Sequence, residues 1–166
     1  MAYDNQRGGT RSYGQPGGYV QQGNRNSRPY TPPAPPKTIE AMPIPEDYVD
    51  EAERVISALK AAGNGRIRVT TSKLRGFLTL VTDIYNRESL RKEEVLSSDS
   101  QLKLMRLRVR IVYDAGREND VCDFVEKAKL LEYIKGIGSS RAEMIRFAHY
   151  MEALVAYHRF LGGKEN

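Results

Sequence analysis

The strongest constraint on the fold comes from residues 99–117, whose sequence is DSQLKLMRLRVRIVYDAGR and whose side chains recur with the period of an α-helix. On a helical projection at about 100° per residue, four basic side chains lie within roughly 60° of one another: Lys103, Arg106, Arg110 and Arg117. Apolar side chains occupy most of the remaining circumference: Leu102, Leu104, Met105, Leu107, Val109, Ile111, Val112 and Tyr113. A surface helix with one core-facing side does not have this pattern. The sequence therefore predicts a central helix with neighbours on several sides and one solvent-exposed basic strip.

Arg108 is the exception in this helix, because the projection places it within the apolar arc, where it would need a buried carboxylate or carbonyl partner. The basic strip itself has two interpretations. Charged residues at helical spacing are common on a purely solvated face, and Asp114 could pair with Arg110 or Arg117. Four cations beside one anion favour instead a surface that binds an anionic partner.

Length and composition limit the class of protein. At 166 residues the chain has the length of one domain, and no apolar run is long enough to span a bilayer. The N-terminal residues MAYDNQRGGTRS lack the apolar centre of a secretory signal, so we expect a soluble, cytoplasmic protein with no membrane partner. The single cysteine, Cys122, excludes an internal disulfide framework. The net charge of +5 and the isoelectric point near 9.3 favour nucleic acid as a partner without establishing it.

Residues 1–43 differ in composition from the rest of the chain. They hold nearly all of the prolines and have almost no aliphatic residues, so they cannot bury enough apolar surface to offset the chain entropy. We therefore predict a disordered tail at 1–43 and a helical domain at 44–166. The arginines, glycines and tyrosines of the tail resemble RNA-binding segments whose arginine and aromatic faces stack on bases. A flexible, solubilising leader is the simpler interpretation.

Five segments of the domain have the apolar spacing of amphipathic helices, at about 45–63, 72–85, 99–117, 119–136 and 140–161. Asp99 or Ser100 is the expected cap of the third, and a short helical turn is expected before it at 88–96. Ser140 and Glu143 have the spacing of a capping box at the start of the last. No segment alternates like a strand. The predicted fold class is all-α, a compact bundle of about five helices.

The chain lacks the residue arrangements that enzymes use. His149 and His158 are nine residues apart on one predicted helix, about 180° from each other, so they cannot share a metal ion without other ligands. There is no phosphate-binding glycine loop with its lysine, no CxxC pair and no GxSxG motif. The sequence predicts a protein that is not an enzyme and needs no cofactor or metal.

One short motif indicates a different kind of binding site. Residues 130–145, LLEYIKGIGSSRAEMI, contain the GIGxxxAxxI spacing of a helix-hairpin-helix, whose glycine turn directs backbone N–H groups at a nucleic-acid phosphate. A glycine cap followed by a serine cap is also the ordinary way to join two antiparallel helices. The ordinary connection is the preferred interpretation, and a free-standing DNA or RNA binder that uses residues 136–142 is the alternative function.

Three strings, in their order and spacing on a helical protein, resemble one family. Residues 70–78 read TTSKLRGFL, residues 113–118 read YDAGRE and residues 150–161 read YMEALVAYHRFL. Together they resemble the small subunit of the Csm effector complex, the RNA-targeting particle of type III-A CRISPR systems, from about residue 70 to residue 163. The resemblance implies a helical bundle without catalytic activity that acts in antiviral defence. It also implies stacking of copies in a filament beside the guide-binding subunits, along the groove that holds guide and target RNA.

The resemblance is transferred to single residues only where the strings match. Lys73 and Arg75 stand in the SKLR string and Arg117 in the AGR string, so the resemblance implies that these three contact RNA backbone. Phosphate contacts suit a subunit used along any target, because they position RNA without reading bases. The basic strip and the exposed side of the last helix extend the candidate set to Lys73, Arg75, Lys103, Arg106, Arg110, Arg117 and Arg146. The expected partners are other Csm subunits, copies of the same chain, and guide and target RNA.

Overall fold

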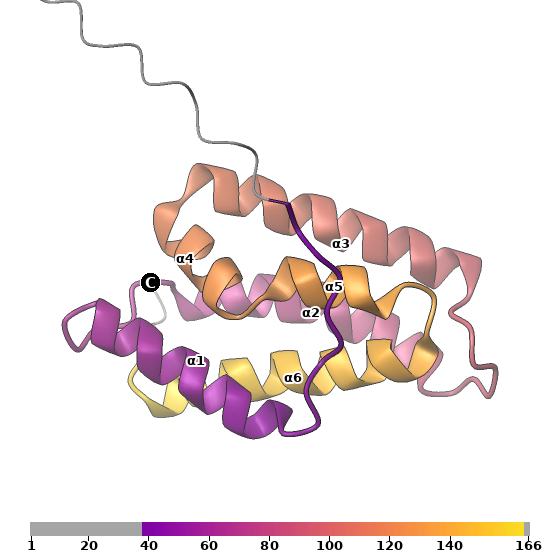
Figure 1. Ribbon diagram of the computed structural model, residues 1–166, viewed down its shortest axis with the longest axis horizontal. Coiled ribbons are helices and arrows are strands. Elements are labelled where there is room, and N and C mark those ends of the chain that lie inside the picture. Colours follow the sequence, from indigo (N-terminus) through magenta and orange to yellow (C-terminus); the bar gives the residue numbers. More distant parts are fainter. Residues whose placement is uncertain (1–37, 165–166) are drawn as a thin grey trace, which may run out of the picture. The chain divides into compact units, whose positions relative to one another are not determined.

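The computed structural model describes residues 38–164, and within them the chain is helical (Figure 1). Six α-helices follow one another along this range: α1 (Tyr48–Ala62), α2 (Thr71–Glu88), α3 (Ser98–Arg117), α4 (Asn119–Lys127), α5 (Leu130–Ile137) and α6 (Arg141–Phe160). The described residues form no strand, and their one isolated β-bridge joins Val95 to Ser140. The predicted all-α class is confirmed. No helix in the range is long and apolar enough to cross a membrane.

The described range begins inside the predicted tail. Residues 38–43 belong to the folded unit, because the Met42 N–H donates to the Glu132 carbonyl at 3.1 Å and Lys135 Nζ donates to the Ile39 carbonyl at 2.7 Å. Glu132 and Lys135 belong to α5, so these two hydrogen bonds connect the extended segment to α5, over which it runs (Figure 1). The rest of the predicted tail, residues 1–37, lies outside the described residues, so its disorder stays a prediction.

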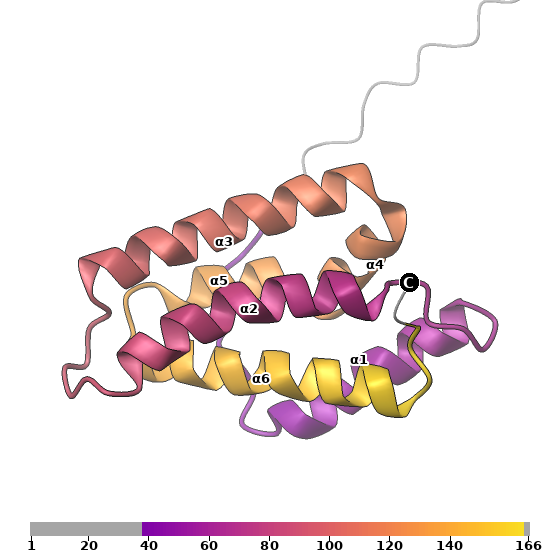
Figure 2. The same ribbon diagram turned by 180° about the vertical axis from the view of Figure 1, so that it is seen from behind.

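The helix at the centre of the bundle is α6, which packs against α1, α2 and α5. In Figure 2 it lies alongside α2 over most of its length. Two of the largest fully buried side chains of the core, Phe147 and Tyr150, belong to this helix. Its buried residues cover a wide arc: Met144, Phe147, Ala148, Tyr150, Met151, Leu154 and His158. The prediction that the basic-striped helix is central is wrong. That helix, α3, packs against α2, α4 and α5 and lies at the edge of the bundle in both views.

A break divides the fourth predicted helix into α4 and α5, which accounts for six helices instead of about five. The break occurs at Lys129, whose φ of 50° lies in the left-handed region. A helix break frees carbonyl groups that need new partners. The Ala128 carbonyl accepts a hydrogen bond at 3.1 Å from the hydroxyl of Tyr150, which is fully buried and packs edge-on against Tyr133. A tertiary contact with α6 therefore stabilises a break that the helical spacing of this segment does not reveal.

Side-chain caps define the starts of three helices. Ser140 Oγ accepts from the Glu143 N–H at the start of α6, as the capping box predicted, and Thr70 Oγ1 accepts from the Lys73 N–H at the start of α2. Helix α3 begins two or three residues earlier than expected, because its cap is Ser97 and not Asp99 or Ser100; Ser97 Oγ accepts from the Ser100 N–H at 3.2 Å. The helical turn predicted at 88–96 is wrong, since the chain leaves the helix after Glu88.

Candidate nucleic-acid interface

Helix α3 turns only one narrow arc toward the core. Ser100, Leu104, Leu107, Ile111 and Asp114 are its buried residues, spaced three and four apart. The basic strip lies beside this arc, on the flank that faces α2. Burial of one arc thus leaves the basic strip accessible to solvent.

The structure brings Lys73 of α2 and Arg110 of α3 to the same groove between the two helices. Ser72, Gly76, Phe77, Leu80 and Asp114 complete its lining. Arg110 Nε donates to Asp114 Oδ2 at 2.7 Å, and this contact raises the pKa of the Arg110 guanidinium further above its ordinary value. The groove therefore combines two cations from separate parts of the sequence with one buried carboxylate.

Two ion pairs between sequence-distant residues connect α2 with α3 and the residue after it. Lys103 Nζ lies 2.6 Å from Asp83 Oδ2 of α2 and 3.6 Å from Asp99 Oδ2 of its own helix. Lys73 Nζ lies 2.6 Å from Glu118 Oε1, just after α3. The carboxylates of Asp83 and Glu118 are both partly exposed, and Lys103 holds the pKa of Asp83 below its usual range. These pairs join α2 to α3 and keep the lysines on the groove side.

Arg106 and Arg117 complete the exposed part of the strip. Arg106 is exposed and makes no hydrogen bond or ion pair with any residue of the range 38–164. Arg117 donates to the Tyr113 hydroxyl at 3.1 Å, and its guanidinium lies 5.4 Å from the centre of the same ring. Both guanidinium groups thus remain available to an anion.

The two remaining candidates are not part of this groove. Arg75 lies two residues after Lys73, about 200° around α2, and lines a separate, shallow depression with Thr79, Thr82 and Asp83. Arg146 lies on α6 and donates to Glu143 one turn away at 2.9 Å. The structure therefore gathers five of the seven candidates on the α2–α3 side and places these two elsewhere.

The side of α3 that faces away from the core is apolar, which the sequence analysis did not foresee. Met105, Val109, Val112 and Tyr113 are exposed there, and Arg108, which was predicted to be buried, is exposed among them. The prediction for Arg108 was wrong because it assumed that all apolar arcs of the helix would be covered. The helical spacing of these apolar residues was visible in the sequence, but the sequence did not show that this side of the helix is exposed.

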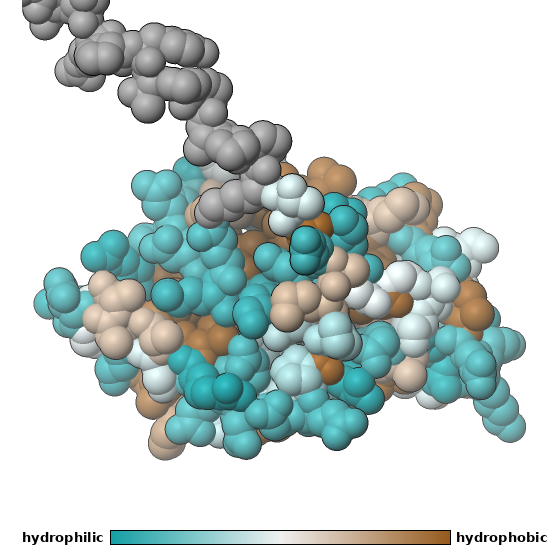
Figure 3. Space-filling view, viewed as in Figure 1, coloured by the Kyte–Doolittle hydropathy of each residue, from teal (hydrophilic) through white to brown (hydrophobic). Residues whose placement is uncertain are grey.

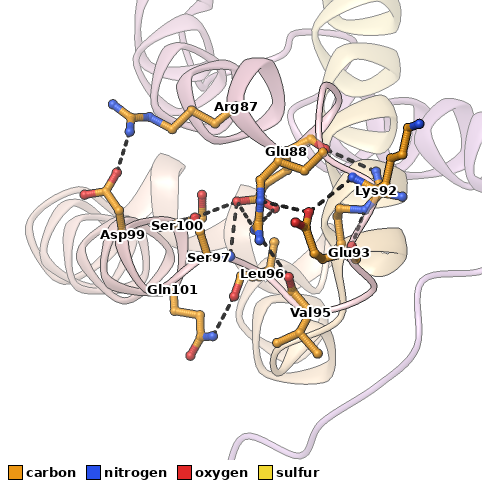
Figure 4. Close-up of polar contacts among 12 residues, drawn as sticks. Arg87, Glu88, Lys92, Glu93, Val95, Leu96, Ser97, Asp99, Ser100 and Gln101 are labelled. Carbon is orange, nitrogen blue, oxygen red and sulfur yellow. Dashed lines mark hydrogen bonds and ion pairs between the residues drawn. The ribbon is translucent and has the colours of Figure 1, made fainter.

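A buried acidic residue positions the start of α3 (Figure 4). Glu88, at the end of α2, is fully buried and accepts from Arg91 at 2.9 Å and from the Ser97 hydroxyl at 2.7 Å. Burial raises the pKa of Glu88, but the side chains of Ser100, Ser97 and Arg91 and the Ser97 N–H together lower it by more, so the pKa lies below its usual range. Since Ser97 is also the cap of α3, Glu88 connects the end of α2 to the beginning of the basic strip.

The hairpin at 136–142 uses its backbone groups within the chain. The Ser140 N–H donates to the Ile137 carbonyl at 2.8 Å, and the Arg141 N–H donates to the Glu94 carbonyl at 2.9 Å. Gly136 is required by packing, because a Cβ atom there would lie 1.9 Å from the Met42 carbonyl oxygen. Two N–H groups of the turn are thus occupied, which favours the interpretation as an ordinary helix connection.

Comparison with known proteins decides which family this arrangement belongs to. Residues 45–164 match the family described as Csm2 type III-A. The chain belongs to this family. The Csm2 match begins at α1 and so extends beyond the strings that carried the resemblance, which started near residue 70. The chain is therefore a small subunit of a type III-A CRISPR Csm complex.

Individual Csm2 proteins show the same relationship. The chain is 47% identical over 120 residues to the CRISPR system Cms protein Csm2 of Streptococcus thermophilus, which covers 72% of this chain and 95% of that protein. It is 43% identical over 122 residues to the protein of the same name from Mycobacterium tuberculosis, and this alignment covers 74% of this chain and 97% of that protein. The Enterococcus italicus protein of the same name is 35% identical over 95 residues, and this alignment covers 55% of this chain and 67% of that protein. The two longer alignments, of 120 and 122 residues, are about as long as the helical bundle.

Proposed function

We propose that this Csm2 chain is a non-catalytic, cytoplasmic subunit that stacks with copies of itself and contacts the backbone of guide or target RNA through the α2–α3 side. The proposal is supported by the groove that Lys73 and Arg110 line together, and by the position of Lys103, Arg106 and Arg117 on the same flank of α3 as Arg110. Arg75 and Arg146 are additional candidates that would meet RNA only on other surfaces of the bundle. No cofactor, metal or membrane takes part.

The ion pairs on this side are compatible with phosphate binding. Lys73 and Lys103 are paired with carboxylates that remain partly exposed, and exposed ion pairs contribute little to stability. A phosphate can therefore replace or join such a carboxylate at low cost, whereas Arg106 has no partner among residues 38–164 to lose. Contacts of this type bind RNA of any sequence and weaken steeply with salt.

The test is a charge reversal that leaves the fold intact. Arg106→Glu with Arg117→Glu changes two exposed residues, while Arg110 is retained because it pairs with the buried Asp114. The matched control reverses two exposed cations outside the groove, Arg66→Glu and Lys92→Glu. Csm complexes that contain each variant are compared for binding of single-stranded target RNA over a range of salt concentrations.

The strip variant is expected to weaken RNA binding by roughly tenfold or more and to reduce the salt slope by about 0.7 for each lost phosphate contact. The control is expected to bind as the wild type does. Equal binding by both variants would contradict the proposed interface. A chain that does not co-purify with a guide-loaded complex from cells with native expression would contradict the proposed role as a whole.

A further inference from the structure

The solvent-facing side of α3 is apolar, whereas the solvent-facing side of an ordinary surface helix is polar. Val109 is 69% exposed, Met105 59%, Tyr113 56% and Val112 49%. They lie opposite the buried arc formed by Leu104, Leu107 and Ile111, where a surface helix normally carries its polar residues. In Figure 3, apolar side chains reach the surface along the edge occupied by α3. An exposed apolar surface of this kind marks an interaction site.

The spacing of this surface fits a helical partner. Leu102, Met105, Val109 and Val112 follow one another at intervals of three, four and three residues, the spacing with which one helix packs against another. Arg106 and Arg108 flank the apolar line on its two sides, and both are exposed. The partner helix should therefore have acidic residues beside its contact line.

Helix α1 of a second copy has the complementary charge. Residues 98–117 carry five basic and two acidic side chains, whereas residues 46–62 carry five acidic and two basic ones. Asp50 and Glu53 are exposed on the outward side of α1, and the small residues Ser57, Ala58 and Ala61 beside them permit close approach of another helix. Opposite charges at the rim of a contact favour one partner and register over others.

The positions of the two helices determine the kind of assembly. Helices α1 and α3 lie at opposite edges of the bundle in both Figure 1 and Figure 2, with α2 and α5 between them. A contact between different surfaces on opposite edges is heterologous and adds copies in an open stack. Pairing of α3 with α3 would instead bring Arg106 and Arg108 of two copies together, which like-charge repulsion disfavours.

We propose that the apolar side of α3, with its flanking arginines, docks on the acidic outward side of α1 in the next copy of the chain. This assignment rests on the self-stacking proposed above and specifies its two surfaces. Lys103, Arg110 and Arg117 of the basic strip then lie beside the contact and stay open to RNA, whereas Arg106 borders both surfaces.

Two variants, each with one damaged surface, test the assignment in the full-length chain. Met105→Asp with Val109→Asp damages the α3 surface, and Asp50→Lys with Ser57→Lys damages the α1 surface; all four positions are exposed. Leu90→Asp, at an apolar residue that is 87% exposed in the α2–α3 loop, is the matched control. Sedimentation velocity over a wide concentration range measures the size of each protein and of the two variants mixed.

The wild type and the Leu90→Asp control are expected to increase in mass with concentration, and each damaged variant is expected to associate at least about tenfold more weakly. The equimolar mixture should form dimers and nothing larger, because one intact α1 meets one intact α3. A wild type that remains monomeric overturns the proposal. So does an α1 variant that still dimerises alone, which would indicate α3–α3 pairing.

The same variants separate this inference from the proposed function. If only the α1–α3 assignment is wrong, the wild-type chain still co-purifies with a guide-loaded complex and the RNA-binding difference between strip and control variants remains. If the proposed function is wrong, co-purification and RNA binding fail in the wild type. The α1 variant contains none of the RNA-binding candidates, so its RNA-binding surface is unchanged.

Discussion

The Asp114 carboxylate and the Arg110 guanidinium lie 2.7 Å apart on adjacent turns of α3, yet the side chain of Asp114 is 6% exposed and that of Arg110 is 59% exposed. The arginine thus neutralises a carboxylate that belongs to the core boundary. Its proposed contact with RNA and its contribution to folding therefore need separate measurements.

Arg110→Ala is expected to lower the thermal midpoint, because the buried Asp114 loses its ion-pair partner. Arg106→Ala is the comparison, since Arg106 is exposed on the same helix and pairs with nothing in the range 38–164; its midpoint should stay at the wild-type value. Thermal unfolding followed by circular dichroism measures both. Equal midpoints for the two variants would show that the Arg110–Asp114 pair does not stabilise the fold.

Glu88→Gln is expected to reduce the free energy of unfolding by about 1–3 kcal/mol at neutral pH, because a buried, hydrogen-bonded carboxylate is lost next to Arg91 and Ser97. The pKa of Glu88 lies below its ordinary 4.5 in the fold. Its stabilising contribution is therefore complete above pH 4.5 and is lost as the pH falls through the lower folded-state value. Urea unfolding from pH 7 to pH 3 should show a smaller loss of stability for the variant than for the wild type.

His158 is expected to make folding sensitive to mild acid. It is fully buried, and its Nε2 lies 2.8 Å from the Val69 carbonyl oxygen. Burial lowers the pKa of His158 below 6.5, and the hydrogen bond to Val69 opposes this only in part. Because the unfolded chain binds the proton more readily, stability falls as the pH drops below 6.5 toward the folded-state pKa.

The measurement is the thermal midpoint of wild type, His158→Gln and His149→Gln between pH 7.5 and pH 5. The wild type and the His149 variant should lose stability over this range, and the His158 variant should lose less. A His158→Gln variant with the full wild-type pH dependence would assign the effect to other groups.

Gly136→Ala is expected to destabilise the bundle by about 1–3 kcal/mol, because its Cβ would collide with the Met42 carbonyl oxygen. Gly138→Ala should cost about 1 kcal/mol, because the φ of Gly138 is +52°. Faster hydrogen exchange of the Met42 amide is the specific readout for Gly136. RNA binding by folded Gly138→Ala protein should equal that of the wild type; loss of binding would support the hairpin as a nucleic-acid site.

Local patterns in the sequence were sufficient to predict the helices and most of their ends. Apolar residues at intervals of three and four identified the amphipathic segments, and Ser140 caps the helix that it was expected to begin. These features depend on residues within one or two turns of each other. The break at Lys129 could not be predicted in this way, because it is stabilised by Tyr150, 22 residues from Ala128 along the chain.

The sequence was sufficient to predict which basic residues share one flank of a single helix, but not which residues of a second helix lie beside them. Helical geometry placed Lys103, Arg106, Arg110 and Arg117 on one flank of α3, and the structure retains that flank. The pairing of Lys73 with Glu118 and of Lys103 with Asp83 depends on how α2 and α3 meet, and so does the exclusion of Arg75 from their groove.

Residue spacing alone established an all-α chain and the members of each helix face, since periodicity and caps are short-range properties, and three short strings already resembled the Csm small-subunit family. Tertiary packing selected which apolar arc of α3 enters the core. Apolar residues surround most of that helix, so its own sequence is compatible with several orientations. Burial of Leu104, Leu107 and Ile111 against α2, α4 and α5 chose one of them, and it left Met105 and Val109 on the outside.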